Sequence, residues 1–248
     1  IKVEKFLDIK KIKDAQVFTD YFPFFEVKDV FRKSQKMEEL LNDLPDINQG
    51  GSYPTEVINS GIHFRQLVNE LKGKELKYIL EEKFELDLSN TPSMTTFRGF
   101  SKKKDGQIHV DSRSKLVTLL LYLNKKWNHE NGNLRLLKNR TDIEGYFVEI
   151  PATIGSLVAF KVDINCSHGW HGYKGFEGKR LSLQLNYIHE QSIKRHKLMY
   201  NDYLIVGPKN DNDICESVEK KLLEIKNKKL IFISRGDKSG TNIKEIAL

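Results

Sequence analysis

The chain lacks long apolar runs and has few cysteines. None of its hydrophobic stretches approaches the roughly 20 residues that a membrane-spanning helix needs. Two cysteines, Cys166 and Cys215, are too few for the disulfide framework of a small secreted protein. No secretory signal is recognisable at the start, where the chain begins at Ile1. We therefore expect no membrane span and a reducing, cytoplasmic compartment.

The chain also lacks a concentrated charge of one sign. Its 41 Lys and Arg exceed its 34 Asp and Glu by only 7, and the lysines are scattered. The short clusters at 102–104 and 125–126 have no interleaved aromatic residues, so we interpret them as solvated surface charges. With 248 residues and 39% hydrophobic content, the composition fits one large globular domain, alone or with a small appendage.

Helical periodicity is confined to the N-terminal third. Apolar residues recur at helix spacing over 37–44, 64–71 and 76–84, after an entering strand at 22–27, and 48–54 is expected to be a loop. From Met94 the period changes to two, and Gly, Asn and Asp separate the predicted strands at 95–100, 107–111, 116–123, 133–137, 146–150, 156–160 and 180–188. The prediction is an α+β fold: an antiparallel jelly roll with helices packed on one outer face.

One ordered set of residues points to chemistry: His109 and Asp111, then His171, then Arg180. A His and an Asp two positions apart lie on the same side of an extended strand. With a distant second His they supply two imidazoles and one carboxylate, an arrangement that leaves open positions and suits non-haem Fe(II). A trailing Arg supplies a planar cation that grips a carboxylate through two hydrogen bonds.

The segments around these residues strengthen the interpretation. They read IHVD at 108–111, LVTLLLYLN at 116–124, GSLVAF at 155–160, SHGWHG at 167–172 and RLSLQLNY at 180–187. Together they resemble the 2-oxoglutarate and Fe(II)-dependent oxygenases, specifically the prolyl-4-hydroxylase-like branch, over roughly residues 22 to 190. The resemblance implies a double-stranded β-helix, which is the jelly roll predicted above.

The resemblance implies that Fe(II) is held by His109, Asp111 and His171. His168 is a second candidate for the third ligand. We choose His171 because its nine-residue separation from Arg180 matches the family pattern. His168 is then a hydrogen-bond partner of a ligand or a residue at the edge of the site.

The resemblance also implies a 2-oxoglutarate site. Arg180 anchors the far carboxylate of the co-substrate, and Ser182, the next inward residue on the same strand, shares it. Tyr122 falls at the position of a co-substrate tyrosine in the family, although a buried structural tyrosine is the alternative. Arg98 either meets an acidic group of the substrate or pairs with Asp105.

The activity implied is hydroxylation of an unactivated C–H bond with O₂, releasing succinate and CO₂, with ascorbate in a supporting role. The substrate would be a small molecule such as an amino acid, or a peptidyl side chain. Asp111 argues against halogenation, because halogenating relatives carry a small residue there. Asn186 argues against nucleic acid, because oxygenases that repair alkylated bases carry a second Arg at that position. Nothing in the sequence indicates the oligomeric state.

The C-terminal residues, 196–248, do not fit the oxygenase domain, which we place at 1–195. They resemble a fragment of the periplasmic tungstate- and molybdate-type binding proteins. We predict a small β-α-β appendage with a strand at 203–206, a helix at 216–227 and a strand at 230–234. This segment favours the alternative function, a non-catalytic metal- or oxyanion-binding protein.

Overall fold

The computed structural model describes residues 4–33, 36–56, 58–172, 175–189, 197–200 and 203–206. Its helices are α1 (Ile9–Asp14), α2 (Met37–Asn42), α3 (Ile62–Leu71) and α4 (Lys74–Phe84). Its strands are β1 (Phe24–Val27), β2 (Tyr53–Pro54), β3 (Ser93–Ser101), β4 (Lys115–Tyr122), β5 (Leu134–Leu137), β6 (Tyr146–Ile150), β7 (Leu157–Lys161), β8 (His168–Trp170), β9 (Gly178–Ile188), β10 (Lys197–Tyr200) and β11 (Tyr203–Val206).

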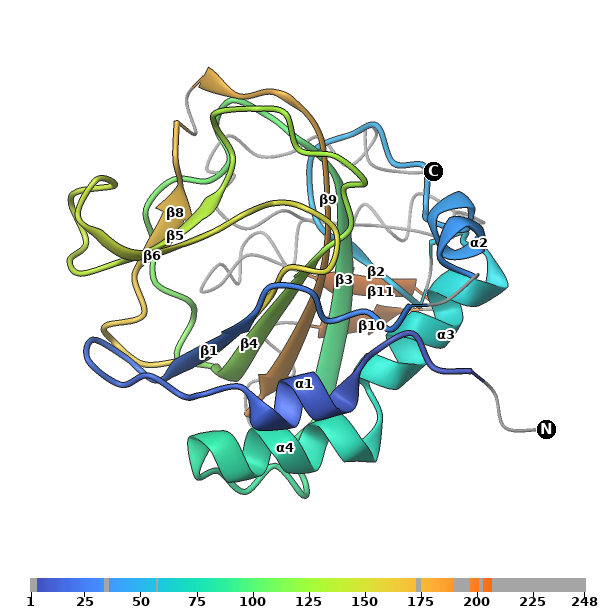
Figure 1. Cartoon of the computed structure of the whole chain (residues 1–248), viewed down its shortest axis with the longest axis horizontal. Coiled ribbons are helices and arrows are strands. Elements are labelled where there is room, and N and C mark those ends of the chain that lie inside the picture. Colours follow the sequence, from blue (N-terminus) through green and yellow to red (C-terminus); the bar gives the residue numbers. More distant parts are fainter. Residues whose placement is uncertain are drawn as a thin grey trace.

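Two antiparallel sheets form the jelly roll. The larger has the strand order β1-β7-β4-β9-β3-β2, and the smaller has the order β6-β5-β8. β4 and β9 occupy the centre of the larger sheet, and the smaller sheet lies across from it (Figure 1). The jelly roll predicted from the alternating pattern is confirmed, and both sheets contribute residues to its interior.

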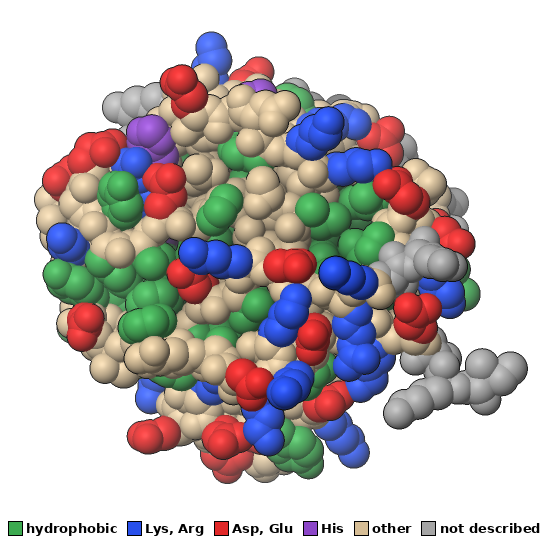
Figure 2. Space-filling model, in the orientation of Figure 1, with side chains coloured by type: hydrophobic (Ala, Val, Ile, Leu, Met, Phe, Trp, Pro, Cys, Tyr) green, Lys and Arg blue, Asp and Glu red, His purple; other side chains and the backbone are tan. Residues whose placement is uncertain are grey.

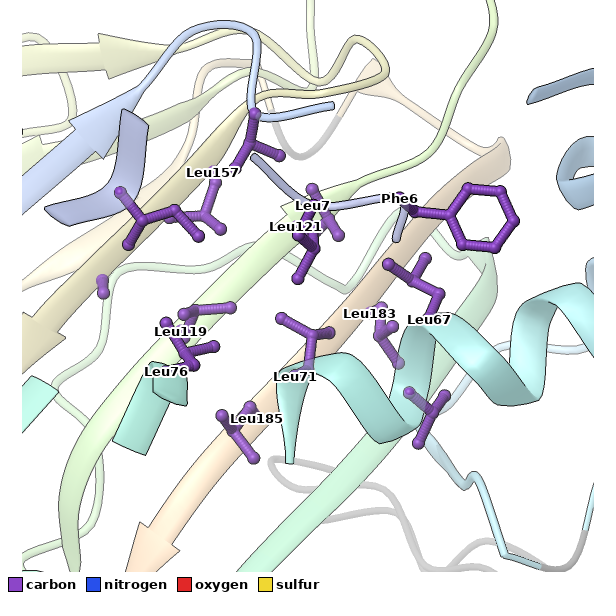
Figure 3. Close-up of a cluster of buried hydrophobic side chains, with 14 of the residues drawn as sticks. Phe6, Leu7, Leu67, Leu71, Leu76, Leu119, Leu121, Leu157, Leu183 and Leu185 are labelled. Atoms are coloured by element: carbon purple, nitrogen blue, oxygen red, sulfur yellow. The ribbon is translucent and has the colours of Figure 1, made fainter. Parts of the chain in front are cut away.

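The outer face of the larger sheet is covered by helices. The stripes expected on α3 and α4 are buried, and they end in Leu71 and Phe84. Leu71 lies among Leu119, Leu121, Leu183 and Leu185 of β4 and β9 (Figure 3). Because side chains alternate along a strand, the residues between these leucines must face the interior of the roll.

The inner face of the larger sheet differs in character. A second apolar cluster lies between the sheets and includes Phe160, Leu136 and Trp170. On β9, however, the inward positions are Arg180, Ser182 and other polar residues. Polar groups buried inside an otherwise apolar roll need partners, so this face is where a site is expected.

Before residue 190 the structure departs from the expected elements in four places: α1, β2, the segment 107–111 and β8. Residues 9–14 form α1, which was not expected, and the predicted loop at 48–54 contains the short strand β2. The segment 107–111 is not a strand; its ladder contact is one isolated bridge between His109 and His168. That bridge continues from β8, a three-residue strand with no apolar alternation to reveal it.

The C-terminal appendage is described only in part. The strand expected at 203–206 is present as β11, and it pairs with β10 in a two-stranded antiparallel sheet. The helix expected at 216–227, the strand at 230–234 and Cys215 lie outside the described residues. The domain boundary at 195/196 stays a prediction.

The described helices are short, and the visible surface carries charges of both signs. In the part of the chain that the structure describes, no helix is long and apolar enough to cross a membrane. Cys166 is a buried free thiol. On the face shown in Figure 2, Lys and Arg side chains are interspersed with Asp and Glu.

Candidate metal centre

His109, Asp111 and His168 meet at one point of the structure. One potential ligand atom from each lies within 4.8 Å of the others. The backbone explains how residues so far apart in sequence meet: the His109 N–H donates to His168 O at 3.0 Å, and the His168 N–H donates to His109 O at 2.9 Å. Residues that exchange both hydrogen bonds across an antiparallel pair present their side chains on the same face.

The two imidazoles are oriented by backbone carbonyls. His109 Nδ1 lies 2.8 Å from Gln107 O, and His168 Nδ1 lies 2.7 Å from Cys166 O. A carbonyl only accepts, so each Nδ1 carries a proton, and in a neutral ring the lone pair is then on Nε2. This arrangement, in which the far nitrogen is fixed by a hydrogen bond, is typical of metal-binding histidines.

The protonation state of His168 also suits a ligand. The side chain is buried, and this burial, assisted by the neighbouring His109, lowers the pKa of His168 to about 3. A neutral imidazole is therefore present throughout the physiological range, as a metal requires. His109 is exposed, so the cluster opens to solvent on its side.

Asp111 is held by donors from the start of β4. Lys115 Nζ lies 3.2 Å from Asp111 Oδ2, and Thr118 Oγ1 donates to the same oxygen. Thr118 in turn accepts from Asn186 Nδ2 at 2.8 Å, and Asn186 accepts from Gln184 Nε2 at 2.9 Å. A chain of hydrogen bonds therefore runs from β9 to the carboxylate and fixes its orientation.

His171, which we chose from the sequence as the third ligand, does not join this cluster; the structure brings His168 beside His109 and Asp111 instead. His171 Nδ1 lies 3.1 Å from Glu130 O, and its Nε2 lies 3.8 Å from Glu144. The physical reason is register. His168 is the cross-strand partner of His109, whereas His171 lies past the end of β8.

Arg180 lies inside the roll, against Trp170 and Tyr122 of the apolar cluster between the two sheets. The side chain is 2% exposed, its Nε donates to Gly132 O at 2.9 Å, and its Nη2 donates to Tyr122 Oη at 3.0 Å. Its guanidinium carbon lies 3.8 Å from the ring centroid of Trp170. Among the described residues no carboxylate lies within 4 Å of this guanidinium.

Burial lowers the pKa of Arg180, although an arginine stays charged in proteins. A buried cation whose described partners are a carbonyl, a phenol and two aromatic faces has room for a carboxylate. The loop before His109 packs against the same aromatic wall. Gly106 has φ +80°, and a Cβ there would lie 2.3 Å from the Trp170 ring. A glycine is therefore required at this contact.

Tyr122, Ser182 and Arg98 form one row across three strands. Ser182 on β9 is the register partner of Tyr122 on β4 and of Arg98 on β3, and it is buried. All three therefore lie on the face of Arg180. Arg98 donates to Asp105 Oδ2 at 2.8 Å, so of the two roles considered for it the pairing with Asp105 is present.

Two partners of Asp111, Lys115 and Thr118, were not identified from the sequence. His168 was considered only as the second candidate for the third ligand. The TxxxY spacing of Thr118 and Tyr122 on one strand was a usable signal, because it places both on one face. No local signal marks Lys115, whose contact with Asp111 depends on the turn between them.

Residues 97–188 match the sequence profile of the 2OG-Fe(II) oxygenase superfamily. The match contains the whole His109, Asp111 and His168 cluster as well as Arg180. This segment is therefore similar to the 2OG-Fe(II) oxygenases. The donor set of the cluster, two imidazoles and one carboxylate, fits the Fe(II) ion that gives the superfamily its name.

Several solved structures are similar in fold to the chain. A prolyl-4-hydroxylase of Pseudomonas putida is 15% identical with a TM-score of 0.47, over 77% of this chain and 96% of that one. A Trichoplax adhaerens prolyl hydroxylase in complex with a hypoxia inducible factor peptide fragment is 16% identical with a TM-score of 0.47, over 75% and 89%. HygX of Streptomyces hygroscopicus with iron bound is 15% identical with a TM-score of 0.46, over 69% and 84%.

The C-terminal part of the chain has relatives of another kind. The tungstate-binding protein TupA of Peptoclostridium acidaminophilum is 45% identical over 65 residues, 23% of this chain and 21% of that protein. TupA of Campylobacter jejuni is 45% identical over 62 residues, 23% of this chain and 22% of that protein. The chain thus spans about a fifth of the length of these curated relatives.

Proposed function

We propose that the chain is an Fe(II)- and 2-oxoglutarate-dependent dioxygenase that hydroxylates an unactivated C–H bond of a small molecule, such as an amino acid, or of a peptidyl side chain. One observation carries the proposal: the His109, Asp111 and His168 cluster shares the interior of the roll with a buried Arg180 that has no carboxylate partner among the described residues. Neither the cluster nor Arg180 alone indicates the reaction. Together they supply a site for a metal and a site for a dicarboxylate.

The ligand set we propose is His109 Nε2, a carboxylate oxygen of Asp111 and His168 Nε2. Bound there, Fe(II) supplies O₂ activation coupled to the decarboxylation of 2-oxoglutarate to succinate and CO₂. Three protein ligands leave the remaining positions for co-substrate and O₂. The protein residues bind the metal and the co-substrate, orient them and exclude water from the site.

Arg180 is the proposed anchor of the co-substrate carboxylate remote from the metal. Its guanidinium is oriented by Gly132 and Tyr122 before the co-substrate arrives, so little side-chain freedom is lost on binding. Trp170 covers one face of the guanidinium and keeps water from it. The hydroxyls of Ser182 and Tyr122 supply two further donors on the same inward row.

The test is 2-oxoglutarate turnover in the absence of a prime substrate. Incubation of the full chain with Fe(II), 2-oxoglutarate and O₂ should release succinate slowly, and ascorbate is proposed to sustain this uncoupled reaction by keeping the metal reduced. Asp111→Ala is the matched control, because it removes one ligand. Equal succinate release from wild type and Asp111→Ala contradicts the proposal.

The identity shared with TupA favours a second candidate, an oxyanion-binding function of the C-terminal part. Calorimetry with tungstate on the full chain distinguishes the two. Tight tungstate binding supports the second function, and turnover without tungstate binding supports the oxygenase alone.

A further inference from the structure

The carboxylate of Asp111 is paired with a lysine that lies almost entirely inside the protein. Lys115 Nζ is 3.2 Å from Asp111 Oδ2, and the two side chains are 5% and 4% exposed. Burying an ammonium group is costly unless it is paired, and a surface position for this lysine would avoid the cost. A buried cation directly against a proposed metal ligand therefore requires an explanation.

The geometry around Asp111 Oδ2 gives the first part of that explanation. This oxygen accepts from Lys115 Nζ and from Thr118 Oγ1. A carboxylate oxygen offers about two lone-pair sites, so these two donors hold Oδ2 and fix the orientation of the carboxylate. A metal at this cluster would therefore be held by a carboxylate that is already oriented by the protein.

The charge of Lys115 gives the second part. A metal bound by Asp111 would share this carboxylate with Lys115, so only the carboxylate group would separate the ammonium from the ion. Oxidation of Fe(II) to Fe(III) adds one positive charge at the metal, which a neighbouring cation in a poorly solvated interior opposes. Hydrogen bonds from Lys115 and Thr118 also withdraw electron density from the carboxylate, which weakens its preference for the ferric ion.

We propose that Lys115 is a positioning residue of the metal centre: it fixes the orientation of the Asp111 carboxylate and, through its charge, holds the iron in the ferrous state. This inference rests on the proposed iron site and goes beyond it, because it assigns a role to a residue outside the ligand set.

The chain offers a matched control lysine. Lys161 at the end of β7 is half-buried, and its Nζ donates to Phe84 O at 3.2 Å on the helix-covered side of the sheet. Lys161→Met therefore removes the same chemical group from the same sheet without touching the cluster.

The experiment is an anaerobic redox titration of the full chain loaded with one equivalent of iron, followed by the absorbance and the electron paramagnetic resonance of the ferric ion. Lys115→Met removes the donor and the charge, Lys115→Gln keeps a donor without the charge, and Lys115→Arg keeps both. At a fixed potential, the ratio of ferric to ferrous iron should rise about tenfold or more in Lys115→Met and Lys115→Gln. That change is a fall of about 59 mV or more in the midpoint for a one-electron couple.

In Lys115→Arg and Lys161→Met the ratio of ferric to ferrous iron should stay within about twofold of wild type. The first variant retains the charge, and the second removes a charge that is not near the metal. If Lys115→Met does not fold, the Gln variant carries the same test. Wild-type protein that holds iron, with Met and Gln variants of unchanged ratio, overturns this inference and leaves the proposed function standing. Wild-type protein that binds no iron overturns both.

Discussion

His109 and His168 form a reciprocal pair, with backbone hydrogen bonds of 3.0 and 2.9 Å and ring centroids 4.2 Å apart. This single bridge joins the segment before β4 to the smaller sheet, because His168 is also the register partner of Leu136 on β5. The consequence is that the metal cluster is built at the point where the two sheets of the roll meet. A change that disturbs the pairing of β8 should therefore disturb metal binding without touching a ligand.

The first prediction concerns the co-substrate anchor. Arg180→Met removes the buried guanidinium, and we expect the apparent KM for 2-oxoglutarate to rise far more than in Ser182→Ala. Loss of one partner of a buried ion pair costs roughly 3–5 kcal/mol, or about two to four decades in affinity. Steady-state succinate release at varied 2-oxoglutarate checks this. Unchanged 2-oxoglutarate affinity in Arg180→Met removes the anchor assignment.

The second prediction uses the two tryptophans of the chain, Trp127 and Trp170. Trp170 lies against Arg180, whereas Trp127 packs on Phe176. Binding of 2-oxoglutarate at Arg180 changes the charge over the Trp170 ring, so it should change the tryptophan emission of wild type and of Trp127→Phe. The response should vanish in Trp170→Phe. A response that follows Trp127 instead places the co-substrate elsewhere.

The third prediction concerns acid and the metal-free protein. The folded pKa of His168 is about 3 and its unfolded value is 6.5, because burial disfavours the charged ring. Between these values the unfolded chain binds a proton that the folded chain does not. Stability from this residue is therefore complete above pH 6.5 and is lost as the pH falls toward 3.

Urea unfolding of the metal-free chain between pH 7 and pH 5 measures the effect, which is at most about 1.4 kcal/mol per pH unit from one group. His168→Gln should flatten the pH dependence over this interval, and His171→Gln should not. Equal slopes in wild type and His168→Gln mean that His168 is not held neutral by the fold.

The fourth prediction concerns the C-terminal residues, which contain none of the proposed ligands. A chain ending at Glu190 should stay soluble and retain 2-oxoglutarate turnover. The full chain should bind tungstate weakly, because it spans about a fifth of the tungstate-binding proteins it matches. Micromolar tungstate affinity, or loss of turnover on truncation, means that this segment is a working part of the protein.

Local patterns were sufficient for much of the fold. The buried stripes of α3 and α4 repeat at helix spacing, and β9 alternates between leucines and polar residues, so their type and approximate bounds were predictable. The six residues of α1 were missed because a single amphipathic turn and a half leaves too few apolar positions to establish a period.

The same distinction between local and nonlocal signals applies to the site residues. His109, Asp111 and Arg180 were predictable as a set because their order and spacing are carried by the sequence itself. The choice between His168 and His171 was not, because it depends on which residue of a three-residue strand faces His109 across the roll. Spacing to Arg180 favoured His171, but pairing with β5 placed His168 opposite His109. The pairing of β8 with β5 therefore decides which histidine lies beside His109.

The most direct test of the metal centre is the iron content of four variants. After anaerobic loading with Fe(II) and removal of excess metal, the wild type and His171→Ala should retain one iron per chain, whereas His109→Ala, Asp111→Ala and His168→Ala should retain none. Each loss has the same cause, because one of three ligands is removed from a site with no spare protein donor in the described cluster. Iron retained by His168→Ala and lost by His171→Ala would contradict the account.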